Sequence, residues 1–171
     1  ALNNTVRIPS ELEPLYRSLL TDSSYQVIEL TLDLLAFYFP QHIPDYLALT
    51  KYEKGNRSLN VRIKHLMIDY AMNGDEAALN ELIDYTSNSY EFLTRVGASE
   101  ALMELNVFNI KALENMLDAT FSFNSRLRGP VAKVINHFFD QSMYKRMIVD
   151  YVSNQKWSES EFRKVKKYLI P

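Results

Sequence analysis

The sequence contains no cysteine, which excludes a disulfide framework, a thiol nucleophile and a cysteine-ligated zinc site. A chain without cysteine fits a reducing compartment, but exported proteins also lack it, so the localisation stays open. No apolar run approaches the roughly 18 residues of a membrane span, and residues 1–13 show no signal-peptide pattern. Only four glycines occur in 171 residues, fewer than the turns of an all-β domain of this size require.

The remaining composition is that of an ordinary globular protein, with 47% hydrophobic and 23% charged residues. A formal net charge of −2 gives no basic field for nucleic acid or an anionic membrane. We therefore expect no nucleic-acid partner and no membrane span. The length predicts a single domain over residues 1–171. Because the chain starts with Ala1 instead of methionine, we expect it to be a piece of a longer protein.

Helical periodicity dominates the sequence, and the stretch SYEFLTRVGASEALMEL (residues 89–105) is its best example. In the same stretch the small residues Gly97, Ala98 and Ala101 would let a neighbouring helix approach closely. The whole chain shows no convincing strand, and we predict helices near residues 10–20, 24–39, 43–51, 59–72, 75–86, 89–105, 108–120, 125–140, 142–153 and 159–169. Five residues of the example share one helical face: Phe92, Val96, Ser99, Leu102 and Met103.

Polar residues at capping positions indicate where several of these helices begin and end. Capping-box spacing occurs at Ser10–Glu13, Asn88–Glu91 and Ser158–Glu161. The pair Asn73-Gly74 is typical of a helix end, and Asp75 is typical of the cap of the next helix.

Four segments resemble one another and recur at intervals of 36, 29 and 35 residues, from the small polar residues Ser24, Asn60, Ser89 and Asn124. Each segment continues as an apolar helix and is followed by a shorter one. Helix pairs at this period are typical of solenoids, where each pair buries its apolar face against the next. The sequence therefore predicts an all-α fold of about ten helices, a right-handed α-α superhelix of stacked antiparallel pairs. The terminal helices would close its ends, and a non-repetitive helical bundle is the alternative.

No catalytic or metal-binding motif is present, since the sequence lacks HExxH, GxGxxG, a Walker loop and a G-x-S-x-G elbow. The histidines His42, His65 and His137 lie on separate predicted elements without a second ligand at metal spacing, and we expect His42 to be solvated. Carboxylate pairs such as Asp75–Glu76 and Glu159–Glu161 fall in first helical turns, where the helix dipole favours negative charge. We predict no catalytic, cofactor-binding or metal-ligating residue in this chain.

Two basic stretches have both a binding and a structural interpretation. Three positive charges in Arg126–Lys133 surround Gly129-Pro130, which suggests either an anion site or, as we favour, a helix distorted or restarted at the proline. The last helix alternates basic and apolar residues, as membrane- or partner-binding helices do, but we favour a terminal cap. The 11 tyrosines fit an aromatic groove or, equally, packing between helices.

Three stretches in order, DSSYQVIELTLDLLAFYFP, NVRIKHLMIDYA and YTSNSYEFLTRVGASEALMELN, resemble the C-terminal helical domain of aminopeptidase N-type (gluzincin) zinc metallopeptidases. The likeness is to the bacterial branch, whose C-terminal region is built of HEAT- or armadillo-like helix pairs. It extends from about Asp22 to Lys167. The family's HExxH, its downstream Glu and its GxMEN loop are absent here, so none of those roles passes to any residue of this chain.

The resemblance implies a non-catalytic C-terminal domain that packs on the catalytic domain of the same polypeptide and encloses or gates its active-site cavity. A peptide substrate would meet it at most indirectly. Zinc would belong to the parent's catalytic domain, and this chain would hold no cofactor. An alternative is a freestanding helical-repeat scaffold that binds a peptide or protein partner. A third is a compact helical enzyme without a recognisable motif.

Overall fold

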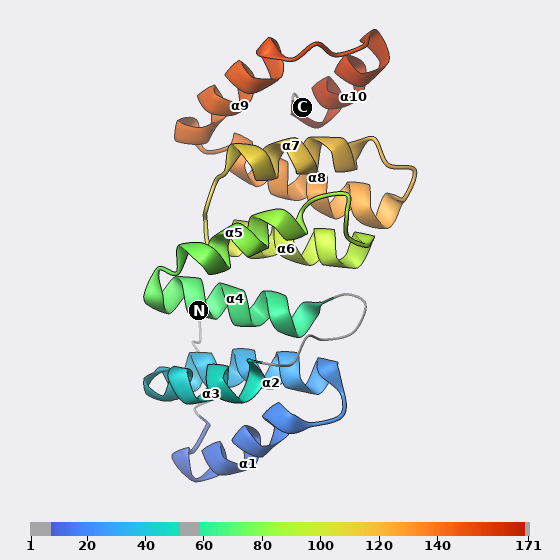
Figure 1. Ribbon diagram of the computed structural model, residues 1–171. Helices are drawn as coiled ribbons and strands as arrows, with labels where there is room; N and C mark the ends of the chain where they lie inside the picture. The colour runs from blue at the N-terminus through green and yellow to red at the C-terminus, as the bar shows by residue number, and fades with distance from the viewer. Residues whose placement is uncertain (1–7, 52–58, 170–171) are drawn as a thin grey trace, which may run out of the picture. The chain divides into compact units, whose positions relative to one another are not determined.

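The computed structural model describes residues 8–51 and 59–169, and this part of the chain is all-helical with ten α-helices and no strand (Figure 1). The predicted all-α class is therefore confirmed. The chain divides into two compact units, residues 1–74 and 75–171, and each is described here by itself. The superhelical stacking of the helix pairs stays a prediction.

The first unit is built around α2, which contacts α1, α3 and α4. Its core is aliphatic except for Phe39 and Tyr46, and Leu20, Leu32, Leu35 and Tyr46 are fully buried there. The predicted helix 10–20 is one α-helical stretch between two 3-10 turns. In chain order the elements are η1 (Ser10–Leu12), α1 (Glu13–Ser18), η2 (Leu19–Thr21), α2 (Tyr25–Tyr38), η3 (Pro40–His42), α3 (Ile43–Thr50) and α4 (Asn60–Asn73).

The second unit is built around α8, which contacts α6, α7, α9 and α10. Ala98 and Ala101 on α6 are buried, as expected of small residues at a helix contact, whereas Gly97 is only half-buried. The only tryptophan of the chain, Trp157, donates to the carbonyl of Val152 at 2.7 Å. The helices are α5 (Glu76–Tyr85), α6 (Phe92–Glu104), α7 (Ile110–Thr120), α8 (Ser125–Phe139), α9 (Ser142–Asn154) and α10 (Glu159–Leu169).

The structure confirms several of the predicted helix ends. Gly74 follows α4 in the left-handed conformation, and its N–H donates to the carbonyl of Tyr70 at 2.8 Å. The carboxylate of Asp75 then caps α5 by accepting from the N–H of Ala77 at 2.8 Å. Before α10 the capping box forms in both directions, with Ser158 and Glu161 each bonding to the other's backbone N–H.

Two predicted capping boxes are wrong. Helix α6 begins at Phe92, so Glu91 occupies the cap position itself, and the N–H of Tyr90 bonds instead to the carbonyl of Ser87 in a preceding turn. At the N-terminal box, Ser10 makes no capping bond, and the Glu13 carboxylate is bound by side chains 29 and 33 residues away. Capping-box spacing alone therefore does not predict whether the side chains bond to the backbone of their own helix start or to groups elsewhere.

Helix α8 runs through Pro130 without a restart, so that part of the prediction is wrong. The missing proline N–H leaves only one helical bond unmade. Gly129 precedes it and has no Cβ to collide with the proline ring, which relieves the usual restriction on a residue before proline. An interior proline still costs about 3 kcal/mol, because its ring also crowds the carbonyl four residues earlier, so the packing of α8 must offset this cost.

We expect Gly74→Ala to lower the free energy of unfolding by about 1 kcal/mol, because a left-handed backbone is strained for alanine. Apart from residue 74 itself and its two neighbours in the chain, no atom lies within 4 Å of the Cβ that alanine would add, so the backbone conformation produces the effect. Urea unfolding followed by circular dichroism measures it. Gly74→Asn should recover part of the loss, since asparagine tolerates this conformation. Equal losses of unfolding free energy for Gly74→Ala and Gly74→Asn would contradict the left-handed conformation as the cause.

Candidate functional site

The three histidines belong to different elements and have different local roles. His65 on α4 is buried, and its Nε2 donates to the carbonyl of Leu47 at 3.1 Å. His137 on α8 is exposed and lies 3.1 Å from the side-chain nitrogen of Gln141. His42 is half-exposed, so it is solvated in part as predicted, and it is also bound to the Glu13 carboxylate, which was not predicted. Within residues 8–51 and 59–169, no group of three or more His, Cys, Asp or Glu residues is arranged to hold a metal ion.

The first polar cluster joins the start of α1 to the start of α3. One oxygen of the Glu13 carboxylate accepts from the Tyr46 hydroxyl at 2.5 Å and from Nδ1 of His42. The hydrogen bond from Tyr46 is the main cause that lowers the pKa of Glu13. Burial, followed by the bond to Glu13, raises the pKa of Tyr46. The cluster therefore contains a charged carboxylate and a neutral phenol.

A carboxylate–histidine pair can orient a general base, but such a base needs a nucleophile within hydrogen-bond reach. The third member here is a fully buried tyrosine kept in its neutral form. No serine or threonine hydroxyl among the described residues is bonded to His42. The cluster's clearest physical role is to tie α1 to α3.

We expect Glu13→Gln to reduce stability at pH 7 but not at low pH. The folded-state pKa lies below the unfolded value of about 4.3. Such a group stabilises the fold fully above its unfolded pKa, and this contribution is lost as the pH falls through the folded pKa. Urea midpoints from pH 3 to 7 should therefore converge with those of the wild type toward acid. Glu11→Gln, an exposed neighbour, is the control and should leave the pH profile unchanged.

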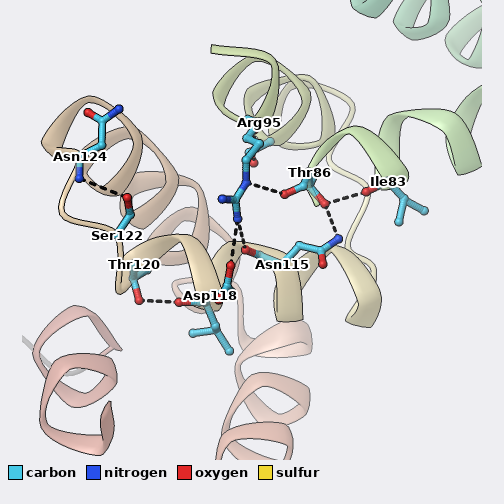
Figure 2. A network of polar contacts seen from close by, with 10 residues as sticks. Ile83, Thr86, Arg95, Asn115, Asp118, Thr120, Ser122 and Asn124 are labelled. Atoms are coloured by element: carbon cyan, nitrogen blue, oxygen red, sulfur yellow. Dashed lines mark hydrogen bonds and ion pairs between the residues drawn. The ribbon is translucent and has the colours of Figure 1, made fainter. Parts of the chain in front are cut away.

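The second polar cluster centres on Arg95 of α6, which is 7% exposed. Figure 2 shows its guanidinium pointing between the end of α5 and the middle of α7. Nε donates to the carbonyl of Thr86 at 3.1 Å, and Nη2 donates to the carbonyl of Asn115 at 3.1 Å. Nη2 also lies 3.3 Å from the carboxylate of Asp118. This one side chain therefore bonds to two neighbouring helices.

Thr86 completes this cluster by two further hydrogen bonds (Figure 2). Its hydroxyl donates to the carbonyl of Ile83 at 2.6 Å and accepts from the side-chain amide of Asn115 at 2.9 Å. The guanidinium of Arg95 thus bonds to two backbone carbonyls and one carboxylate. The cluster is a buried network of hydrogen bonds, and it satisfies backbone carbonyls at the C-terminal end of α5.

An open polar depression of about 510 Å³ lies where α6 and α8 end. Gln141 donates to the side-chain oxygen of Asn106 at 2.9 Å. Asn106 itself has a left-handed backbone with φ of 52°. The rest of the lining is Met103, His137 and two carboxylates, those of Glu104 and Asp140.

The first unit also exposes an apolar stripe on α2, which we call the α2 stripe and which consists of Leu30, Leu34 and Phe37. Leu30 is 61% exposed and Phe37 is 72% exposed, while Leu34 between them is partly buried and packs against the core of the unit. The spacing i, i+4, i+7 places the three side chains along one face. The opposite side of the helix, with Ile28, Leu32 and Leu35, is fully buried. Helix α2 is therefore apolar on two sides.

The other residues singled out in the sequence each have local structural contacts. Of the tyrosines, Tyr46 and Tyr85 are buried, and Tyr144 stacks on Phe108 at 4.8 Å, so packing accounts for them. Arg128 in the basic stretch of α8 donates to the carbonyl of Ser122 at 3.1 Å. Helix α10 contacts α7 and α8, as a terminal cap would.

Sequence reasoning missed both polar clusters. For Arg95 a signal was available, because the residue is charged and yet lies at helical spacing between Phe92 and Ser99 of the apolar face. For Glu13 no sequence signal exists, since its partners are 29 and 33 residues away.

Comparison with known proteins found no family, no curated protein and no solved structure that matches this chain. In the described part of the chain, none of the helices combines the length and the apolar character that a bilayer crossing requires.

Proposed function

We propose that this chain is a non-catalytic helical domain that packs on the catalytic domain of a larger zinc aminopeptidase and helps to enclose or gate its active-site cavity. The three stretches that resemble the C-terminal domain of aminopeptidase N-type enzymes motivate the choice of parent. Zinc and peptide chemistry would belong to that catalytic domain. This chain would contribute the surface that packs on the catalytic domain.

The α2 stripe is the observation that carries the proposal. A helix that is apolar on two sides needs two apolar neighbours. The core of the first unit covers one side and contacts Leu34, but it leaves Leu30 and Phe37 exposed. Large apolar side chains exposed together usually mark a contact surface. A domain that rests on another domain of the same polypeptide would have such a surface when it stands alone.

The first test is the size of the native protein, measured by immunoblot of source-cell extract with an antibody against this chain. The proposal expects a band several times larger than 19.9 kDa. The native protein, immunoprecipitated with the same antibody, should hydrolyse aminoacyl chromogenic substrates. A zinc chelator should abolish this activity. A band at about 20 kDa would overturn the proposal in favour of the freestanding scaffold. A large band without peptidase activity would overturn the choice of parent.

The second test asks whether the α2 stripe is the contact. In the longer protein, Leu30→Glu with Phe37→Glu should weaken the association of the domains and expose new sites to limited proteolysis. Both residues are exposed here, so the isolated chain should keep its unfolding midpoint. Gln26→Glu, at another exposed position of α2, is the matched control. Unchanged proteolysis in the double variant would exclude the stripe as the contact.

A further inference from the structure

A second apolar surface lies in the other unit, between α9, α10 and the end of α8. Here a groove of about 170 Å³ is present. Figure 1 shows α9 and α10 as consecutive helices joined by a short connection at the C-terminal end of the chain. The apolar lining comes from all three helices, and its residues are Phe139, Val149, Val152, Phe162 and Val165. We call this the α9–α10 groove.

The groove has a buried floor and an exposed apolar rim. Val152 and Val165 are buried and form the floor. Val149 is 44% exposed and Phe162 is 47% exposed, and they stand on opposite helices. An apolar side chain placed between them would cover surface that is now in water, which is the source of affinity in helix-in-groove recognition.

Basic side chains border this apolar opening. Lys166 lines the groove directly, and Lys145 lies over the ring of Phe139 with its ammonium 4.9 Å from the ring centre. Arg146 is three residues before Val149, which places it on the same face of α9. Among the described residues, neither Arg146 nor Lys166 forms an ion pair. On α10, Glu159 is already paired with Arg163, so its charge is neutralised by a residue of the same helix.

The charge of this part of the chain is opposite to that of the rest. After Phe139 there are seven basic and four acidic residues, a net charge of +3. Residues 1–139 contain twelve basic and seventeen acidic residues, a net charge of −5. The C-terminal region therefore attracts acidic partners that the rest of the chain repels, which favours both encounter and specificity.

We propose that the α9–α10 groove binds an acidic amphipathic segment of a partner protein, with one large apolar side chain seated between Val149 and Phe162. The volume lies below the ~300–1,000 Å³ of pockets for drug-sized molecules, so it suits a single anchor side chain. A membrane surface is disfavoured because the apolar residues line a concave groove between helices, whereas an interfacial helix presents a convex apolar face. This inference is independent of the proposed parent enzyme.

The test uses the 171-residue chain and fluorescein-labelled synthetic peptides. The probe is a 15-residue helical peptide with Leu and Phe anchors on one face and Glu elsewhere. One comparison peptide has Lys in place of Glu, and another has Ser in place of the anchors. Fluorescence anisotropy should show binding of the acidic anchored peptide only. The absence of such binding at millimolar chain concentration would overturn the proposal.

Matched variants separate the groove from general charge attraction. Arg146→Glu with Lys166→Glu should weaken binding by about tenfold, and Val149→Asp should abolish it. Lys111→Glu with Arg126→Glu changes the net charge by the same amount at the exposed first turns of α7 and α8. This control should bind like the wild type, and circular dichroism verifies that all variants are folded.

Two outcomes would overturn the assignment. Equal weakening in both charge-reversed pairs would mean that the peptide is held by net charge and not by the groove. Co-sedimentation with anionic phosphatidylserine vesicles, lost in Val149→Asp and unaccompanied by peptide binding, would assign the surface to a membrane.

Discussion

Replacing Arg95 by methionine is expected to lower the free energy of unfolding of the second unit by about 3 kcal/mol. Methionine keeps much of the buried aliphatic volume but removes the hydrogen bonds to the carbonyls of Thr86 and Asn115. Carbonyl groups deprived of a charged donor are costly to leave buried. Urea unfolding followed by the fluorescence of Trp157, which belongs to this unit, measures the loss.

The control for this prediction is Asp118→Asn, which removes the carboxylate that pairs with Arg95 among the described residues. The side chain of Asp118 is 58% exposed, so its ion pair is screened by water and contributes less than about 1 kcal/mol. A loss for Asp118→Asn as large as that for Arg95→Met would show that the ion pair, and not the capping of carbonyl groups, stabilises the contact between α5, α6 and α7.

Phe138→Ala is expected to cost about 3–5 kcal/mol, the usual range for removing a buried aromatic side chain. Phe138 is 1% exposed. Its ring meets Phe108 and Tyr144 edge-on, each with ring centres 5.6 Å apart. The substitution would therefore open a cavity where the segment before α7 meets α8 and α9. Thermal unfolding should show a midpoint several degrees lower.

The adjacent Phe139 provides a matched comparison for Phe138. It is half-buried and lines the α9–α10 groove, so Phe139→Ala removes the same atoms from a partly open site. We expect a much smaller loss of stability, because the remaining space is continuous with solvent. Similar thermal midpoints for Phe138→Ala and Phe139→Ala would contradict the expectation that the more deeply buried ring contributes more to stability.

The helix pattern of this protein was largely predictable from its sequence, because it depends on short-range features. Apolar spacing and local caps such as Asp75 and the Ser158–Glu161 box act within four residues, and those helix ends were predicted correctly. The Ser10–Glu13 box failed for a physical reason. A carboxylate with capping spacing is equally able to accept from Tyr46 and His42, and only the fold decides between them.

The candidate surfaces were less predictable than the helices. Leu30 and Phe37 have the same apolar character as the buried Leu32 and Leu35, so their exposure follows from which neighbours cover α2 and not from residue type. The groove likewise requires Phe139, Val149 and Phe162 to meet from three helices. The basic character of α10 was visible in the sequence, but the apolar opening beside it was not.

The passage from α4 to α5 is complete within a few residues. Gly74 ends one helix with a bond to Tyr70, and Asp75 starts the next with a bond to Ala77. On each side of the junction, one terminal backbone group is therefore bonded to a partner within four residues. If the chain were divided between Gly74 and Asp75, each part would therefore keep the residue that caps its own helix. We likewise expect a flexible linker inserted at this point to leave both helices intact.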